Sequence, residues 1–247
     1  MRYFIALSYN GKHYHGWQTQ PNAVTVQQTI EQALSILLRE KISVLGAGRT
    51  DAGVHARLMY AHFDYGPELD IKVLVHQLNS FLPSDIAIKD IYPVTSSAHA
   101  RFDAVQRSYA YWVVQQKDVF LHDYAHYLRA ELDIEAMNQA AAILLETKDF
   151  QCFSKSNTDV KTYICDVRKA YWQQDGQVLV FHITADRFLR NMVRAVVGTL
   201  IEVGLGRCSN TQFKQILASK DRRQAGVSVP AQGLYLTEVQ YPKNIFL

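Results

Sequence analysis

Two spacings of apolar residues alternate along the first part of the chain, one typical of strands and the other of helices. Residues 3–9 alternate large apolar side chains with smaller or polar ones, as in a strand with one face buried. Apolar residues at helical spacing then run over 26–38, and Thr25 with Gln28 forms a capping box that predicts where this helix begins. The chain therefore opens with a strand followed by a helix.

The same spacings predict the other elements of the first half. A strand is expected over 59–65, then a helix opened by Asp70 and ended by Pro83, then a strand over 86–94. The order β-α-β-β-α-β, with the helices crossing one face of an antiparallel sheet, matches the ferredoxin-like unit.

The second half repeats this plan. One helix is expected to begin at Asp133, and two more are expected over 188–203 and 211–217. The expected strands cover 107–115, 163–172, 178–183 and 234–241. The dipeptide Asp175-Gly176 predicts a tight turn between the two middle strands. No linker rich in proline, glycine or serine separates the halves. We therefore expect an α+β protein of two ferredoxin-like (RRM-like) halves, residues 1–104 and 105–247, whose antiparallel sheets join into one framework.

Residues 46–56, GAGRTDAGVHA, have no hydrophobic period and combine three glycines with a cation and a carboxylate. Glycine tolerates positive φ and carries no side chain, so this segment can bend sharply and let a substrate approach. The bend presents Asp51, and Arg49 can fold back to pair with it, which favours the ionised carboxylate. The segment fits a surface turn with a solvated ion pair, and it equally fits a loop that presents an anionic nucleophile.

Tyr109 and Tyr111 lie two residues apart in the expected strand over 107–115, so their rings stand on one face, beside Arg107. That face can stack a nucleobase, and RSYAY resembles the aromatic motif of RNA-recognition modules, except that Ser108 stands where the motif has glycine. A buried aromatic pair with satisfied hydroxyls is the alternative.

Arg187, Arg190 and Arg194 fall at i, i+3 and i+7 and share one face of the helix expected from residue 188. Because an apolar stripe runs along the opposite face, the arginine face is either solvated or a surface that binds phosphates. Toward the end of the helix this face also becomes apolar, so Arg194 is expected where solvent gives way to packing. A cation in that position needs an anion as its partner.

These stretches occur together, in the same order, in one known family. GRTDAGVHA at 48–56 resembles the signature of the TruA family of tRNA pseudouridine synthases. The other stretches that resemble motifs of this family are, in order, 9–11 with 15–18, 100–104 with 107–111, 188–194, and 225–226 with 233–236. The resemblance covers nearly the whole chain, although residues 228–230 depart from the family's pattern.

This resemblance implies a function and a site. It implies a cofactor-free isomerase that acts as a homodimer and converts uridine to pseudouridine at positions 38, 39 and 40 of the tRNA anticodon stem-loop. A cytoplasmic location is expected separately from the cysteines, which are few, odd in number and without Cys-x-x-Cys spacing. The active site would lie in a cleft between the two halves. Asp51 would be catalytic, attacking either the ribose or the uracil ring, with Arg49 and Arg194 keeping it ionised. Tyr109 would stack on the target base, and Leu234 would line the pocket.

Composition bears on the partners. The 247 residues carry a formal net charge of only +3, so a polyanion such as tRNA must meet a local basic patch, for which Arg187 and Arg190 are the candidates. The apolar stretch 193–205 is interrupted by Arg194 and Glu202, so no membrane contact is expected.

Metal and nucleotide sites are not expected. The three cysteines have no Cys-x-x-Cys spacing, and Asp51, His55 and His62 have no recognised metal-ligand spacing. The glycines of 46–56 are followed by no Walker lysine and lack the third glycine of a dinucleotide fingerprint.

A non-catalytic tandem RRM-like RNA-binding protein is the rival interpretation. It accounts for Tyr109 as a stacking platform but not for the loop that carries Asp51. A carboxylate that faces phosphates weakens a site whose task is only to bind RNA, so Asp51 favours catalysis.

Overall fold

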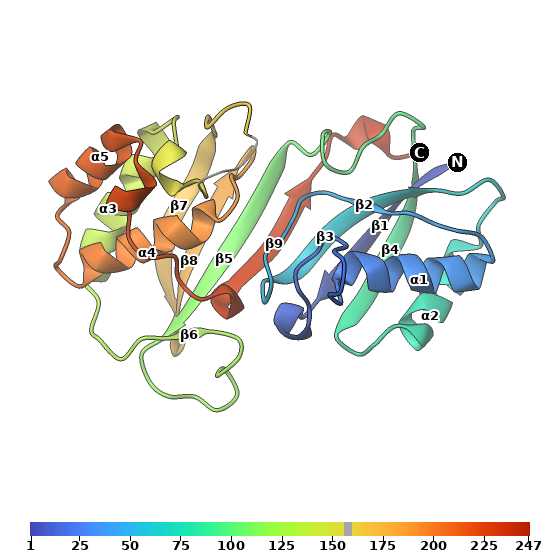
Figure 1. The fold of residues 1–247 in the computed structure, drawn as a ribbon, viewed down its shortest axis with the longest axis horizontal. Helices are drawn as coiled ribbons and strands as arrows, with labels where there is room; N and C mark the ends of the chain where they lie inside the picture. The colour runs from blue at the N-terminus through green and yellow to red at the C-terminus, as the bar shows by residue number, and fades with distance from the viewer. Residues whose placement is uncertain (156–159) are drawn as a thin grey trace. The chain divides into compact units, whose positions relative to one another are not determined.

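The structure is a computed structural model that describes residues 1–155 and 160–247. It is a mixed α/β fold in which most neighbouring strands run antiparallel (Figure 1). The chain divides into two units: the first contains Met1–Val105 and Tyr235–Leu247, and the second contains Gln106–Leu234. The C-terminal segment thus belongs with the N-terminal part of the chain.

The first unit is built around β1 (Arg2–Tyr9). This strand pairs antiparallel with β3 (His55–Asp64) on one side and with β4 (Ile86–Val94) on the other. The short β2 (Leu45–Gly46) and β9 (Leu234–Gln240) both pair with β3, the latter in parallel. Helices α1 (Val26–Leu38) and α2 (Ile71–Phe81) lie together on one face of this sheet (Figure 1).

Most predictions for the first unit are confirmed, including the strand over 86–94 and both helix starts. The Thr25 hydroxyl oxygen accepts a hydrogen bond from the Gln28 amide at 3.4 Å, and the Asp70 carboxylate accepts one from the Val73 amide at 3.1 Å. Strand β3 begins four residues earlier than predicted, at His55. The sequence pattern missed this start because residues 55 and 56 pair with β9, a partner distant in the sequence.

The second unit centres on β8 (Val178–Ala185), which lies antiparallel between β5 (Gln106–Val114) and β7 (Val167–Asp175). Gly176, at φ +57°, forms the predicted turn between β7 and β8. Helices α3 (Ile134–Glu146) and α4 (Met192–Gly204) lie beside this sheet, and α5 (Asn210–Ser219) packs against these two helices (Figure 1). The remaining short elements are η1 (Gly11–His13), β6 (His126–Tyr127), η2 (Gln151–Phe153), η3 (Arg222–Gln224), η4 (Ala231–Gly233) and η5 (Lys243–Ile245).

Two predicted boundaries in the second unit are wrong. The strand expected from residue 163 begins at Val167, because residues 163–165 bond to the segment 148–150 instead of to β8. The helix expected from residue 188 begins at Met192, because Asn191 adopts a left-handed conformation at φ +66°. Asparagine is one of the few residues that tolerate this conformation, which interrupts a helix. Arg187 and Arg190 therefore lie on the segment before α4 and not on its surface.

Helix α4 is apolar almost all round, as predicted. Each of its residues is buried except Arg194 and Glu202. A Cβ at Gly198 would lie 1.9 Å from the Val227 carbonyl oxygen, so the backbone of the segment 225–229 rests directly on the helix. In the part of the chain that the structure covers, no helix combines the length and the apolarity needed to cross a membrane.

Candidate active site

The Asp51 loop connects β2 to β3 and is held by the N-terminal segment. Asp51 is half-buried in this loop. Beside it, the Thr50 carbonyl oxygen accepts a hydrogen bond from the Trp17 amide at 3.2 Å, and the Thr50 hydroxyl is bonded to the Tyr9 hydroxyl at 2.8 Å. The Val54 amide closes the turn by donating to the Asp51 carbonyl oxygen at 3.2 Å. The carboxylate therefore sits on a loop whose backbone is fixed on both sides.

Glycines outside the loop allow this close contact. A Cβ at Gly16, whose φ is +90°, would lie 2.4 Å from the Thr50 carbonyl oxygen, and one at Gly11 would lie 2.0 Å from that of Val54. Within the loop, a Cβ at Gly46 would lie 2.5 Å from the Trp17 ring, whereas a Cβ at Gly48 would meet no atom within 4 Å. The sequence pattern drew attention to the loop's own glycines, but the structure shows that two glycines of the N-terminal segment are equally necessary.

His55 and His62 are buried hydrogen-bond acceptors. The Nδ1 atom of His55 accepts from the Gly11 amide at 3.0 Å, and its ring stacks on Tyr235 at 4.7 Å between centroids. The Nδ1 atom of His62 accepts from the Ala100 amide at 3.1 Å, and burial lowers the pKa of this imidazole to about 4. Among residues 1–155 and 160–247, no three His, Cys, Asp or Glu side chains are grouped as a metal ion would require.

Arg49 is exposed on the same loop as Asp51. Asp51 is half-buried and has interaction partners in the structure. Arg49 presents its charge at the surface, two residues before the carboxylate in the same loop.

Tyr109 and Tyr111 of β5 have different environments. Tyr111 is completely buried, and its hydroxyl donates to the Pro230 carbonyl oxygen at 2.8 Å. Burial raises the pKa of Tyr111 far above its usual value, against a smaller lowering by the Arg194 charge. Tyr109 is half-buried, and its ring meets that of Phe188 edge to face at 5.1 Å between centroids. Tyr111 is thus a packing residue, whereas Tyr109 keeps part of its ring at the surface.

Arg194 is the half-buried cation that the sequence led us to expect on α4. Its Nε atom donates to the Val229 carbonyl oxygen at 2.7 Å, and the Val229 amide donates back to the Arg194 carbonyl oxygen at 3.2 Å. The first bond orients the Arg194 side chain, and the second ties the backbone of α4 to that of Val229. Arg187 is half-buried and Arg190 is exposed on the preceding segment.

Leu234 is buried, 6% exposed, at the start of β9. The residue before it must be glycine, because a Cβ at Gly233 would lie 2.8 Å from the Tyr111 ring. The expected site residues are thus divided between the two units: Arg49 and Asp51 belong to the first, and Tyr109, Arg187, Arg190, Arg194 and Leu234 belong to the second.

One cluster of the second unit was missed from the sequence. The Ser228 hydroxyl oxygen accepts hydrogen bonds from Asn191 Nδ2 at 2.7 Å and from Arg222 Nη2 at 2.9 Å. Ser228 departs from the family's pattern, and this departure was the available signal. The cluster ties the segment 225–230, which holds Arg194, to the start of α4.

Comparison with known proteins agrees with this arrangement of motifs. The model of a family described as tRNA pseudouridine synthase matches residues 5–103 and 140–242, which is more than half of the chain. Both matched segments include expected site residues, Asp51 in the first and Arg194 in the second.

Individual relatives extend over the whole chain. A protein of Parabacteroides distasonis named tRNA pseudouridine synthase A is 54% identical over 99% of this chain and 98% of its own length. Proteins of the same name from Porphyromonas gingivalis and Acetivibrio thermocellus are 52% and 39% identical over 100% and 96% of this chain, and 99% and 98% of their own lengths. This chain therefore belongs to the tRNA pseudouridine synthase family.

Proposed function

We propose that this isomerase converts uridine to pseudouridine at positions 38, 39 and 40 of the tRNA anticodon stem-loop, with Asp51 as its catalytic residue. The reaction breaks the bond between uracil N1 and ribose C1′ and forms one between C5 and C1′. The proton on C5 leaves to solvent, and N1 gains one. The reaction is neither an oxidation nor a reduction, so the proposal needs no cofactor. The observation that carries it is the Asp51 loop, whose backbone the N-terminal segment holds through Thr50 and Gly16.

The other site residues take roles around the extruded base. Flipping a uridine out of stacked RNA costs a few kcal/mol, roughly, which contacts in the pocket must offset. Tyr109 stacks on the base and later accepts the C5 proton as a general base, and Leu234 covers the apolar side of the pocket. Arg194 keeps Asp51 ionised, and Arg49 adds positive charge at the loop. The fixed directions of Tyr109 against Phe188 and of Arg194 against Val229 support these roles.

The proposed architecture places two ferredoxin-like halves around one cleft. Residues 1–104 carry the catalytic loop, and residues 105–247 carry Tyr109 and the basic segment, with the last strand, β9, returning to pair with β3 of the first unit. Antiparallel strands with helices packed on their sheet, found within each unit, support this class of fold. Arg187 and Arg190 bind backbone phosphates. The protein works in the cytoplasm as a homodimer, in which a second copy extends the basic surface available to one tRNA.

Release of tritium tests the reaction. The purified protein is incubated with unmodified tRNA labelled with tritium at uridine C5, and the label released to solvent is counted. The proposal predicts release from this tRNA, and loss of release when the uridines at positions 38, 39 and 40 are replaced by cytidine. A non-catalytic tandem RRM-like protein would bind the tRNA and release no label.

A further inference from the structure

The segment 225–229, which bonds to Arg194, forms neither a helix nor a strand. Backbone groups that no helix or strand pairs need other partners when they are withdrawn from water. Two of these groups bond to α4: the Gly226 amide donates to the Thr199 hydroxyl oxygen at 2.9 Å, and the Val229 amide donates to the Arg194 carbonyl oxygen at 3.2 Å. Helix α4 thus supports one side of the segment.

Arg222 supports the same segment from the turn that contains η3. Its Nη1 atom donates to the carbonyl oxygens of Ala225 at 3.2 Å and Gly226 at 3.1 Å, and its Nη2 atom donates to the Ser228 hydroxyl oxygen at 2.9 Å. The same hydroxyl oxygen accepts from Asn191 Nδ2 at 2.7 Å, as its two lone pairs allow. One half-buried guanidinium therefore joins three points of the segment and, through Ser228, the residue that precedes α4.

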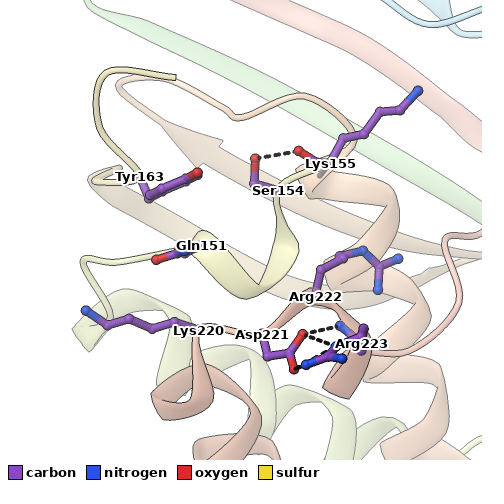
Figure 2. Close-up of a pocket in the computed structure, with 8 residues that line it drawn as sticks. All are labelled: Gln151, Ser154, Lys155, Tyr163, Lys220, Asp221, Arg222 and Arg223. Carbon is purple, nitrogen blue, oxygen red and sulfur yellow. Dashed lines mark hydrogen bonds and ion pairs between the residues drawn. The ribbon is translucent and has the colours of Figure 1, made fainter. Parts of the chain in front are cut away.

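The next residue in the chain, Arg223, is used differently. Both arginines line one pocket of the second unit, together with Asp221 and five other residues. Figure 2 shows Arg223 bonded to Asp221, and the shortest distance in this ion pair is 2.7 Å, from Nη2 to Oδ2. Arg223 thus pairs with a carboxylate of its own turn, and its side chain is 89% exposed. The bonds of Arg222 go instead to neutral oxygens of the segment that holds Arg194.

The direction of the Arg194 side chain depends on this segment. Its Nε atom donates to the Val229 carbonyl oxygen at 2.7 Å, so a shift of Val229 turns the guanidinium. The segment also packs closely on α4, because a Cβ at Gly198 would lie 1.9 Å from the Val227 carbonyl oxygen. Ser228 lies between Val227 and Val229 in the chain, so a change at its hydroxyl acts on both contacts.

We propose that Arg222 is a positioning residue of the isomerisation, which acts through the segment 225–229 on the direction of Arg194. The inference rests on the proposed function, in which Arg194 keeps Asp51 ionised. A guanidinium suits this task because its planar fork holds several acceptors in fixed directions, whereas a lysine ammonium is a point charge on a flexible stem. A positive charge alone should therefore not replace Arg222.

Steady-state tritium release from unmodified tRNA labelled at uridine C5 tests the proposal. Arg222→Gln and Arg222→Lys should both lower kcat about tenfold and leave KM within about twofold of the wild-type value, because the loss falls on the reaction and not on tRNA binding. Arg223→Gln is the matched control, because it removes the same charge from the same pocket and should retain both constants. A wild-type kcat in either Arg222 variant would overturn the proposal.

Ser228 supplies a second pair of variants, in case the Arg222 variants fold poorly. Ser228→Ala removes the oxygen shared by Arg222 and Asn191, whereas Ser228→Thr keeps a hydroxyl there. Ser228→Ala should lower kcat at least about threefold, because two half-buried donors lose their acceptor, and Ser228→Thr should stay within about twofold of the wild type. Equal kcat values for these two variants would contradict the proposal. The melting temperature of each variant is measured, and all assays are run well below the lowest one.

A double-mutant cycle separates positioning from a general effect on the fold. In an Arg194→Lys background the Nε donor to Val229 is absent, so Arg222→Gln should change kcat by less than about twofold. If Arg222→Gln lowers kcat by the same factor in both backgrounds, it does not act through Arg194 and the proposal is wrong. A wild-type protein that releases no label would refute the proposed function and this inference with it. Release by the wild type with unchanged kcat in the Arg222 variants would refute this inference alone.

Discussion

Gly16→Ala should damage the site by pressing on the backbone of the Asp51 loop. Gly16 has φ +90°, and a Cβ added there would lie 2.4 Å from the Thr50 carbonyl oxygen and 3.1 Å from the Asp51 carbonyl carbon. Real Cβ atoms do not approach another heavy atom closer than 3.0 Å, so one of the two segments must move by at least 0.6 Å, the difference between 3.0 and 2.4 Å. One of these two segments is the loop that carries Asp51, so a shift there displaces the carboxylate.

The expected size of the effect follows from these distances. A non-glycine residue in a left-handed conformation costs about 1–2 kcal/mol, and the overpacking adds about 1–3 kcal/mol. A total of about 2–5 kcal/mol lowers the melting temperature of a chain of this size by roughly 4–20 °C. Displacement of a catalytic group by about 1 Å can cost about 100-fold in rate, so the shift should lower kcat by about 10- to 100-fold.

Two assays check this prediction, thermal melting and single-turnover tritium release. Gly48→Ala is the control for stability, because a Cβ at Gly48 would meet no atom within 4 Å. It should melt within a few degrees of the wild type. If Gly16→Ala has the melting temperature and kcat of the wild type, then close packing of the N-terminal segment does not position the Asp51 loop.

Three further predictions concern other parts of the fold. Burial lowers the pKa of His62 from 6.5 to about 4, because it disfavours the charged imidazolium. The neutral imidazole therefore contributes fully to folding stability above pH 6.5, and this contribution is lost as the pH falls toward 4. Between about pH 7 and about pH 5 the free energy of unfolding should fall by about 2 kcal/mol on this account. His62→Asn keeps an acceptor for the Ala100 amide, and urea unfolding at both pH values should show a smaller loss than in the wild type; an equal loss would assign the pH dependence to other groups. Gly198→Ala should lower the free energy of unfolding by at least about 1 kcal/mol, because its Cβ would lie 1.9 Å from the Val227 carbonyl oxygen. This loss should exceed the gain from the higher helix propensity of alanine. An unchanged midpoint of urea unfolding would contradict this packing. Tyr109→Phe should retain tRNA affinity within about twofold, whereas Tyr109→Ala should lower it about tenfold, because only the latter loses the stacking ring. Equal affinities of these two variants in filter binding would argue against stacking on a base.

The elements of the fold were largely predictable because their signals are local. Thr25 and Asp70 mark helix starts by their side chains, and the alternation over 86–94 identifies a strand with one buried face. The errors arose where distant contacts decide the structure. Strand β3 begins early because β9 pairs with it, and α4 begins late because Asn191 takes a left-handed conformation that an apolar pattern does not reveal.

The sequence identified which residues form the site, but not the contacts that hold those residues in place. The pattern of 46–56 singled out Asp51, but no period or spacing indicated that Gly11 and Gly16 make room for the backbone of that loop. The spacing alone did not distinguish Tyr109 from Tyr111, which share a strand face; only the family resemblance gave the stacking role to Tyr109. Their difference depends on Pro230 and Phe188, neighbours in space that lie far away along the chain.

The most direct test of the account is the activity of Asp51→Asn. The substitution keeps the shape of the side chain and removes its charge, so tRNA binding should remain within about twofold while the rate of tritium release falls by at least about 1000-fold. Asp70→Asn serves as the control, because it removes one carboxylate from the same unit and asparagine caps a helix as well as aspartate does. It should release label at the wild-type rate. Release by Asp51→Asn at the wild-type rate would contradict the assignment of Asp51 as the catalytic residue.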